Sequence, residues 1–325
     1  MNNRKSVILS ILFVFSSLFA FAQPKENSPY SRYGLGDPVD NSFTYYQSSG
    51  LAGAFYNPYQ INIVNPASYG YLRATSFEIG LYGKYSNLSS NSNSDNVFSG
   101  NIGYISLGMP LINPINDLLE KKVRKYDIGL TFTLMPNTNV GFNVVSDQEV
   151  EGIGTVRKSY KGTGGTYKAM TGLGARYKNF SLGFNLGYFL GKINYDRQIL
   201  FPELNNPFSN DYHTDFSSNG FTYNVGAIYN VILNKNELKE NENAKHRKLI
   251  FGVYGNTKTS FKSKGTILNT TEIKDIISPS DTRDTVYFDD KLAGTGTLPM
   301  NFGGSIIYNE KGKYIFGVDY SRTLW

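Results

Sequence analysis

The stretch that decides the fold runs from Phe180 to Gly191 and reads FSLGFNLGYFLG. Its even-numbered positions are all phenylalanine, leucine or tyrosine, whereas its odd-numbered positions are serine, glycine or asparagine apart from Phe189. Successive side chains of a β-strand point to opposite faces, so one face of this strand is apolar and the other is small or polar. The stretch therefore predicts a strand that separates an oily environment from a polar one.

The same alternation recurs along the chain after residue 75, and about nine such strands can be counted. The other clear cases lie at 76–85, 126–134, 172–178, 221–233, 302–308 and 314–320.

Several strands exceed the usual five or six residues. The turn at Lys178–Asn179 is very short, while 200–214 and 262–298 are expected to be long polar loops. Short turns and long loops are typical of outer-membrane barrels. A soluble β-sandwich, which also alternates, is the weaker alternative. We expect an all-β chain that forms a transmembrane antiparallel β-barrel.

Composition agrees with a membrane barrel. The chain has 25 tyrosines, 22 phenylalanines and 33 glycines, and its mean hydropathy is slightly negative. A barrel has this profile because only every second strand residue faces lipid. The net charge of +6 is spread along the sequence, so no nucleic-acid partner is expected. The chain has no cysteine, which excludes disulfides and thiolate chemistry.

The N-terminus has the pattern of a cleavable signal peptide over residues 1–22. Arg4 and Lys5 form a basic region, 7–19 is apolar apart from serines, and Ala20–Ala22 offers small residues to the peptidase. The apolar run is shorter than the ~20 residues of a spanning helix. The chain is therefore expected to be exported, with Gln23 as its first mature residue.

Residues 23–74 differ in character from the rest of the mature chain. They are rich in tyrosine, asparagine, proline, serine and glycine and lack sustained alternation. Disordered tails are usually poor in aromatic residues, whereas this segment holds many. An ordered plug inside the barrel is therefore favoured over a disordered tail, with the barrel itself at 75–325.

Four stretches resemble the FadL/TodX (OMPP1) family of outer-membrane transporters in its Bacteroidetes form. They are Ser28–Asp37, the run from Ser49 to Ser68, Gly162–Tyr188, and Leu298–Trp325 with its Leu-Pro start and Asp-Tyr…Trp close. Family members have fourteen strands, so about nine would leave the barrel incomplete at its C-terminus and its edges prone to aggregate. The resemblance implies a plug in the lumen, a ligand bound beside it and exit through a gap in the wall.

Site residues are implied by the same resemblance. Asn65, Pro66 and Ala67 match the Asn-Pro-Ala motif and are expected to anchor the plug. Phe55 and Tyr56 are expected to contact the ligand. Pro136 interrupts a long strand, either as a bend in the wall or as an ordinary edge or bulge proline.

The expected function is passive uptake of hydrophobic compounds such as long-chain fatty acids or aromatic hydrocarbons at the cell outer membrane. Burial of an apolar tail is worth ~25 cal/mol per Å², which suits capture and release. Expected partners are hydrophobic small molecules and outer-membrane lipid. The alternative is a FadL-like barrel that serves as a protein-secretion-system component or cargo carrier, with secretion proteins as partners. A purely structural barrel is the third hypothesis.

No enzyme, cofactor or metal site is expected. His213 and His246 stand in polar stretches without spaced partners. Four aspartates gather near Arg283, at positions 281, 284, 289 and 290. Their spacing is not that of an EF-hand loop, so a solvated outer loop is favoured over calcium binding.

Overall fold

The computed structural model describes residues 26–40, 42–89, 94–112, 119, 125–204, 207–240, 245–273, 282–311 and 313–324. The expected signal peptide at 1–22 lies outside these residues. No helix within the described ranges is long and apolar enough to cross a membrane.

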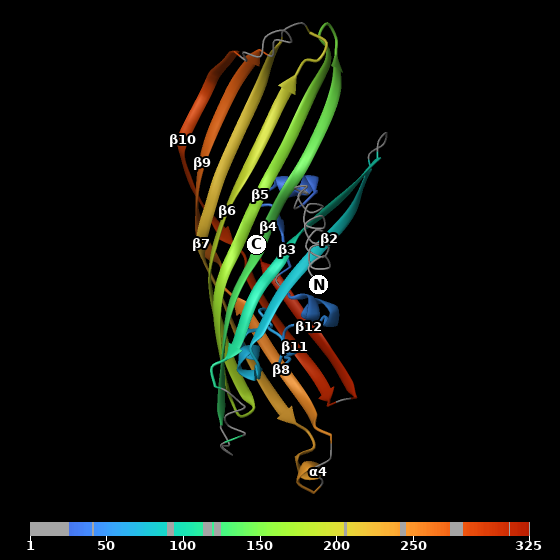
Figure 1. Ribbon diagram of the computed structural model, residues 1–325, viewed down its shortest axis with the longest axis vertical. Helices are drawn as coiled ribbons and strands as arrows, with labels where there is room; N and C mark the ends of the chain where they lie inside the picture. The colour runs from blue at the N-terminus through green and yellow to red at the C-terminus, as the bar shows by residue number, and fades with distance from the viewer. Residues whose placement is uncertain are drawn as a thin grey trace, which may run out of the picture.

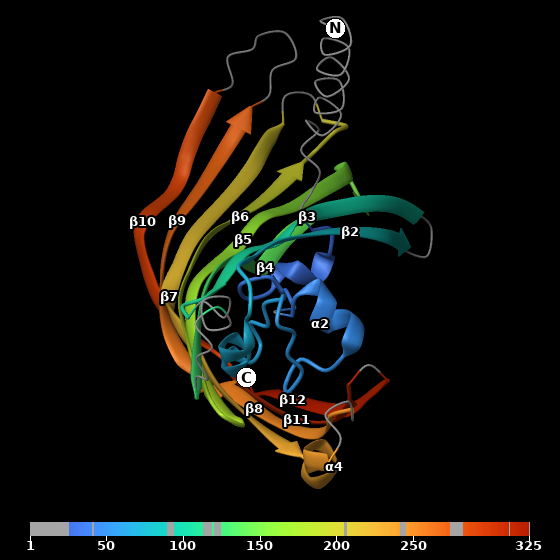
Figure 2. The same ribbon diagram turned by 60° about the horizontal axis from the view of Figure 1, so that its bottom comes forward.

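Twelve antiparallel strands form one curled sheet (Figures 1 and 2). The strands are β1 (Asp37–Pro38), β2 (Ser76–Ser89), β3 (Ser94–Pro110), β4 (Tyr126–Val150), β5 (Gly154–Tyr177), β6 (Phe180–Leu200), β7 (Phe208–Ile232), β8 (Arg247–Asn256), β9 (Thr259–Ile273), β10 (Thr282–Leu298), β11 (Met300–Glu310) and β12 (Tyr314–Leu324). The short helices are η1 (Pro29–Arg32), α2 (Thr44–Ser49), η2 (Pro66–Tyr71) and α4 (Lys235–Glu240).

The main path of the sheet runs β12-β11-β8-β7-β6-β5-β4-β3-β2. Strand β7 pairs with β8 along its C-terminal half and with β9 along its N-terminal half, and β9 carries β10. No pairing joins β2 to β12 within the described part of the chain. The N-terminal segment lies inside the curve of the sheet (Figure 2).

The expected all-β antiparallel architecture is confirmed, but the count of about nine strands is wrong. The expected loop at 262–298 instead forms most of β9 and all of its partner β10, and the second half of the expected loop at 200–214 is the start of β7, from Phe208 onward. These segments are rich in serine, threonine and charged residues. They lack the alternation of apolar and polar residues that marks the other strands. The hydropathy pattern therefore did not predict that these segments pair as strands.

Side-chain burial on β6 is the reverse of that in a soluble protein. The apolar positions from Phe180 to Leu190 are 38–53% exposed, whereas Ser181 and Asn185 are almost completely buried. The apolar face of β6 is therefore its outer, convex face. The small and polar face lies on the concave side, where the N-terminal segment covers it.

Strand β4 contains a bulge beside Pro136. The register passes from Pro136 paired with Tyr167 to Thr138 paired with Thr166, so Asn137 is an extra residue. A bulge of one residue reverses which positions face inward. Met135 is buried before it, and Val140 and other even-numbered residues are buried after it. The inward side chains of β4 are therefore small or polar before the bulge, apart from Met135, and include Val140 and Phe142 after it.

Deletion of Asn137 tests this assignment. Without the extra residue, Val140 would turn to the outer face, and the first part of the N-terminal segment would lose its packing surface. We expect residues 26–40 to become protease-sensitive in the folded protein. The matched deletion of Glu151, in the turn between β4 and β5, should leave protection unchanged. Equal protection in both variants would contradict the bulge.

Candidate functional site: the segment docked on the concave face

The helix η2 crosses the concave face over β4, β5, β6 and β7. Four glycines make this approach possible. Gly129, Gly174, Gly183 and Gly226 lie directly opposite one another on the four strands. A Cβ atom added at any of them would overlap atoms of residues 65–69. The row of four glycines therefore allows the backbone of the segment to lie directly against the sheet.

Asn65 connects the segment to two strands. Its Oδ1 accepts a hydrogen bond from the Ala67 N–H at 3.1 Å and so caps η2, whose first residue is Pro66. Its Nδ2 donates to the carbonyl oxygens of Gly53 (2.5 Å), Ala227 (3.3 Å) and Val253 (3.3 Å). Asn65, Pro66 and Ala67 are all buried. The structure thus places the three predicted anchor residues together at the contact with the sheet.

Polar side chains from the strands bind the backbone of the segment. Ser181 Oγ donates to the Ala67 carbonyl at 2.5 Å, and Asn185 Nδ2 donates to the Ile63 carbonyl at 3.1 Å. Asn224 Nδ2 donates to the Val64 carbonyl at 2.7 Å. Buried carbonyls need such partners. The small and polar face of β6, visible in the sequence, is thus used to hold backbone.

Tyr69 is the most enclosed aromatic residue of the contact. Its hydroxyl donates to Asn185 Oδ1 at 2.9 Å, and the ring is 1% exposed. Burial raises the pKa of the Tyr69 phenol well above its usual range. The hydroxyl therefore stays protonated and remains a donor.

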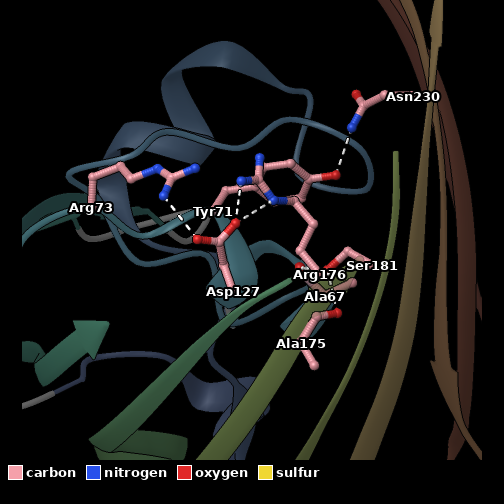
Figure 3. Close-up of polar contacts among 8 residues, drawn as sticks. All are labelled: Ala67, Tyr71, Arg73, Asp127, Ala175, Arg176, Ser181 and Asn230. Atoms are coloured by element: carbon pink, nitrogen blue, oxygen red, sulfur yellow. Dashed lines mark hydrogen bonds and ion pairs between the residues drawn. The ribbon is translucent and has the colours of Figure 1, made fainter. Parts of the chain in front are cut away.

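Charged groups close one end of the contact (Figure 3). Asp127 on β4 accepts hydrogen bonds from Arg73 at 2.9 Å and from Arg176 Nε at 3.0 Å. The Arg176 guanidinium also lies 4.9 Å from the centre of the Tyr71 ring, and Asn230 Nδ2 donates to the Tyr71 hydroxyl at 2.5 Å. Residues from the segment and from three strands thus form one cluster, in which Asp127 links the segment to the wall.

Phe55 and Tyr56, the predicted ligand contacts, pack against aromatic residues of the segment and against a buried cluster that includes Ile228 of the sheet. The Phe55 ring lies 5.8 Å from that of Tyr45. Tyr56 stacks on Tyr71 at 3.7 Å, and its hydroxyl donates to Asn230 at 3.1 Å. Neither lines the cavity of about 800 Å³ between the segment and the sheet. That cavity has a mixed lining that includes Met135, Asn137, Lys168, Asn224, Tyr254 and Asn301.

The polar groups singled out in the sequence have other surroundings than expected. His213 lies on β7, where its Nδ1 is 2.5 Å from Asp196 and its Nε2 is 3.6 Å from Asp215, so its predicted isolation is wrong. Asp284 and Asp289 lie on β10 rather than in a loop, and Asp281 lies outside the described residues. Within the described ranges, no three histidines or carboxylates gather to hold a metal.

Substitution of Tyr69 by phenylalanine tests the contact. Asn185 Oδ1 would lose its donor in a buried site, so we expect the free energy of unfolding to fall by about 1–3 kcal/mol. Denaturant titration in detergent micelles measures this. Tyr85→Phe, on the exposed face of β2, should change stability by less than about 0.5 kcal/mol. Equal effects would show that the buried hydrogen bond contributes nothing.

Comparison with known proteins corrects the expected family. No curated protein matches the chain. A family model described as BamG matches residues 4–325. BamG is a family of the outer-membrane assembly (BAM) machinery, so membership of the FadL/TodX transporters is wrong.

The predicted uptake of hydrophobic compounds, the secretion alternative and the expected small-molecule and lipid partners are overturned with it. The physical reason is that the quoted motifs describe architecture. Asn65 caps a short helix that lies on glycines of the sheet, and Leu298–Pro299 joins β10 to β11. Both roles are independent of what the protein transports or binds.

The predicted outer-membrane location is confirmed. Because the match spans nearly the whole sequence, the chain belongs to the BamG family.

Proposed function

We propose that this chain is a non-enzymatic subunit of the machinery that assembles outer-membrane proteins, and that its partners are other proteins of that machinery. The family match carries this proposal. The docked segment supports it, because the concave side of the sheet is occupied by the chain's own residues. The sheet then acts as a rigid platform and not as a conduit.

The segment from residue 26 to residue 73 would then serve as an internal plug. Its central part touches the sheet by backbone on a row of glycines, and Ser181, Asn185 and Asn224 bind its carbonyls. The ion pairs of Asp127 with Arg73 and Arg176 add a further link. So many short contacts favour a permanent structural element over one that moves to admit a substrate.

The outer face supports a membrane-spanning role. The apolar positions run from 180 to 190 on β6 and from 221 to 231 on β7. Each run is 11 residues long, close to the ~9–11 residues of a tilted strand that crosses a bilayer. Beyond Leu190, the outward positions of β6 become Lys192, Asn194 and Asp196. We infer that the apolar belt spans the outer membrane and that the sheet forms the wall of a β-barrel.

The strands continue well past this belt. β4, β5 and β7 contain 25, 24 and 25 residues, and β9 and β10 lie wholly alongside the polar half of β7. Figure 1 shows these strands rising together at one end of the molecule. The long end of an outer-membrane barrel faces the cell exterior. The polar extension would therefore project from the cell surface, where it can meet partner proteins.

A charged residue placed in the belt tests the membrane assignment. Leu186→Arg puts a cation at the middle of the outward face of β6, which costs about 2–4 kcal/mol if that face meets acyl chains. We expect less folded protein in the outer-membrane fraction, measured by heat-modifiable gel mobility. Gln198→Arg, outward on the same strand beyond the belt, is the control and should be neutral. Normal insertion of both variants would refute the assignment.

Depletion of the chain tests the proposed function. If it belongs to the assembly machinery, the abundance of many unrelated outer-membrane β-barrel proteins should fall together, because their insertion is impaired. Quantitative proteomics of the outer-membrane fraction measures this, and soluble periplasmic proteins are the internal control. Unchanged amounts of other barrel proteins after depletion would sink the proposal.

A further inference from the structure

The concave face of the polar extension carries alternating tyrosine and arginine side chains. Tyr160, Arg197 and Tyr212 lie directly opposite one another on β5, β6 and β7. The Arg197 guanidinium lies 6.0 Å from the centre of the Tyr160 ring and 5.1 Å from that of Tyr212. The Arg32 guanidinium, from η1, lies 5.4 Å from the centre of the same Tyr160 ring. Two cations thus stack on two rings across three strands.

The helix η1 is held firmly at this place. Ser28 N–H donates to the Gly141 carbonyl at 2.9 Å, and the Tyr195 hydroxyl donates to the Arg32 carbonyl at 3.1 Å. Tyr30 and Tyr33 flank Arg32 and are nevertheless 78% and 72% exposed. Exposed aromatic rings on a backbone that is held in place are typical of surfaces that contact a partner. We call Tyr30, Arg32, Tyr33, Tyr160, Arg197 and Tyr212 the arginine–tyrosine surface.

The cations of this surface lack acidic partners. Neither Arg32 nor Arg197 forms an ion pair with any carboxylate of the described residues. The strand register places Asp284 and Asp289 on the same face, but two strands beyond β7. On the outer face of the extension, by contrast, Lys192 pairs with Asp215 at 3.5 Å. Arg32 and Arg197 thus leave positive charge without an acidic partner on the concave side, as far as the described residues show.

We propose that the arginine–tyrosine surface binds an acidic, extended segment of a protein partner within the assembly machinery. Both guanidinium groups lie over tyrosine rings and form no ion pair with a described carboxylate, so their N–H groups can donate to the carboxylates of a partner. Tyrosine and arginine are also the residues enriched at the centres of protein interfaces. This inference rests on the proposed function and specifies the chemistry of the partner.

The position of the surface favours a protein over a lipid. Arg197 is seven residues beyond Leu190, the last apolar outward position of β6, which corresponds to about 23 Å along the strand. The surface is also on the concave side, opposite to the face that carries the apolar belt. An anionic headgroup anchored in the bilayer would have to leave the belt and pass around the sheet to reach it.

Site-specific photo-crosslinking tests the proposal in the full chain in its own membrane. A benzophenone amino acid at Thr214, an inward position of β7 beside Tyr212, would label whatever occupies the surface. We expect an adduct with a protein of the assembly machinery, and the labelled peptide should contain a cluster of aspartate and glutamate. Arg32→Gln with Arg197→Gln should lower the adduct yield about tenfold, because charged pairs at an interface govern its binding.

Matched controls separate this effect from folding. Lys161→Gln with Lys192→Gln removes two cations from the outer face of β5 and β6 and should leave the yield unchanged. All variants should keep the heat-modifiable mobility of the folded parent. Raising the ionic strength several-fold should lower the yield for the parent chain, because exposed charge pairs are screened by salt.

Several outcomes would overturn the inference. These are an adduct with lipid, glycan or a second copy of this chain, a labelled peptide without acidic residues, no adduct in folded protein, or a yield that the arginine substitutions leave unchanged. If these occur while depletion still lowers other barrel proteins, only the partner assignment fails. If an acidic protein outside the machinery is labelled and depletion has no effect, the proposed function fails instead.

Discussion

The rest of the structure depends on the close approach of one backbone to another. Residues 65–69 lie against Gly129, Gly174, Gly183 and Gly226, where a single methyl group at any of the four would occupy the same space. This approach brings the carbonyls of the segment within reach of serine and asparagine side chains on β6 and β7. The hydrogen bonds, the enclosed ring of Tyr69 and the Asp127 ion pairs all require that distance. Polar side chains of the concave face therefore bind the backbone of the segment.

This constraint explains why motifs typical of a transporter led to the wrong function. In this chain, the Asn-Pro-Ala sequence opposite glycines lets a short helix lie flat on the inside of the sheet. The motif reports how the segment is held, and it carries no information about cargo. Phe55 and Tyr56 pack against aromatic residues of their own segment, and their predicted ligand role stays a prediction.

The long strands divide the molecule into two regions, the apolar belt and the polar extension, which differ in the side chains that they expose. In the belt, the outer face is apolar and the inner face is used to hold the segment. In the extension, both faces are polar or aromatic, and stability comes from strand pairing together with a small cluster around Val140, Phe142 and Ile193. The bulge at Asn137 lies between these regions and reverses the positions of β4 that face inward, so that Val140 faces inward after it whereas Phe132 and Leu134 face outward before it. A rigid wall and a projecting surface suit a protein that works through contacts with other proteins.

The sequence by itself determined the all-β class, the strand at Phe180–Gly191 and the exported, outer-membrane character, because period-two alternation depends only on the local chain. It also predicted an anchor at Asn65–Ala67 from a short motif, and the structure places these residues against the sheet. Only the tertiary structure decided that 262–298 pairs as strands, that His213 meets two aspartates, and that Asp127 joins Arg73 to Arg176. Asp127 lies 54 positions from Arg73 and 49 from Arg176, and Asp196 lies 17 positions from His213. These features depend on register and on curvature of the sheet, which no local pattern encodes.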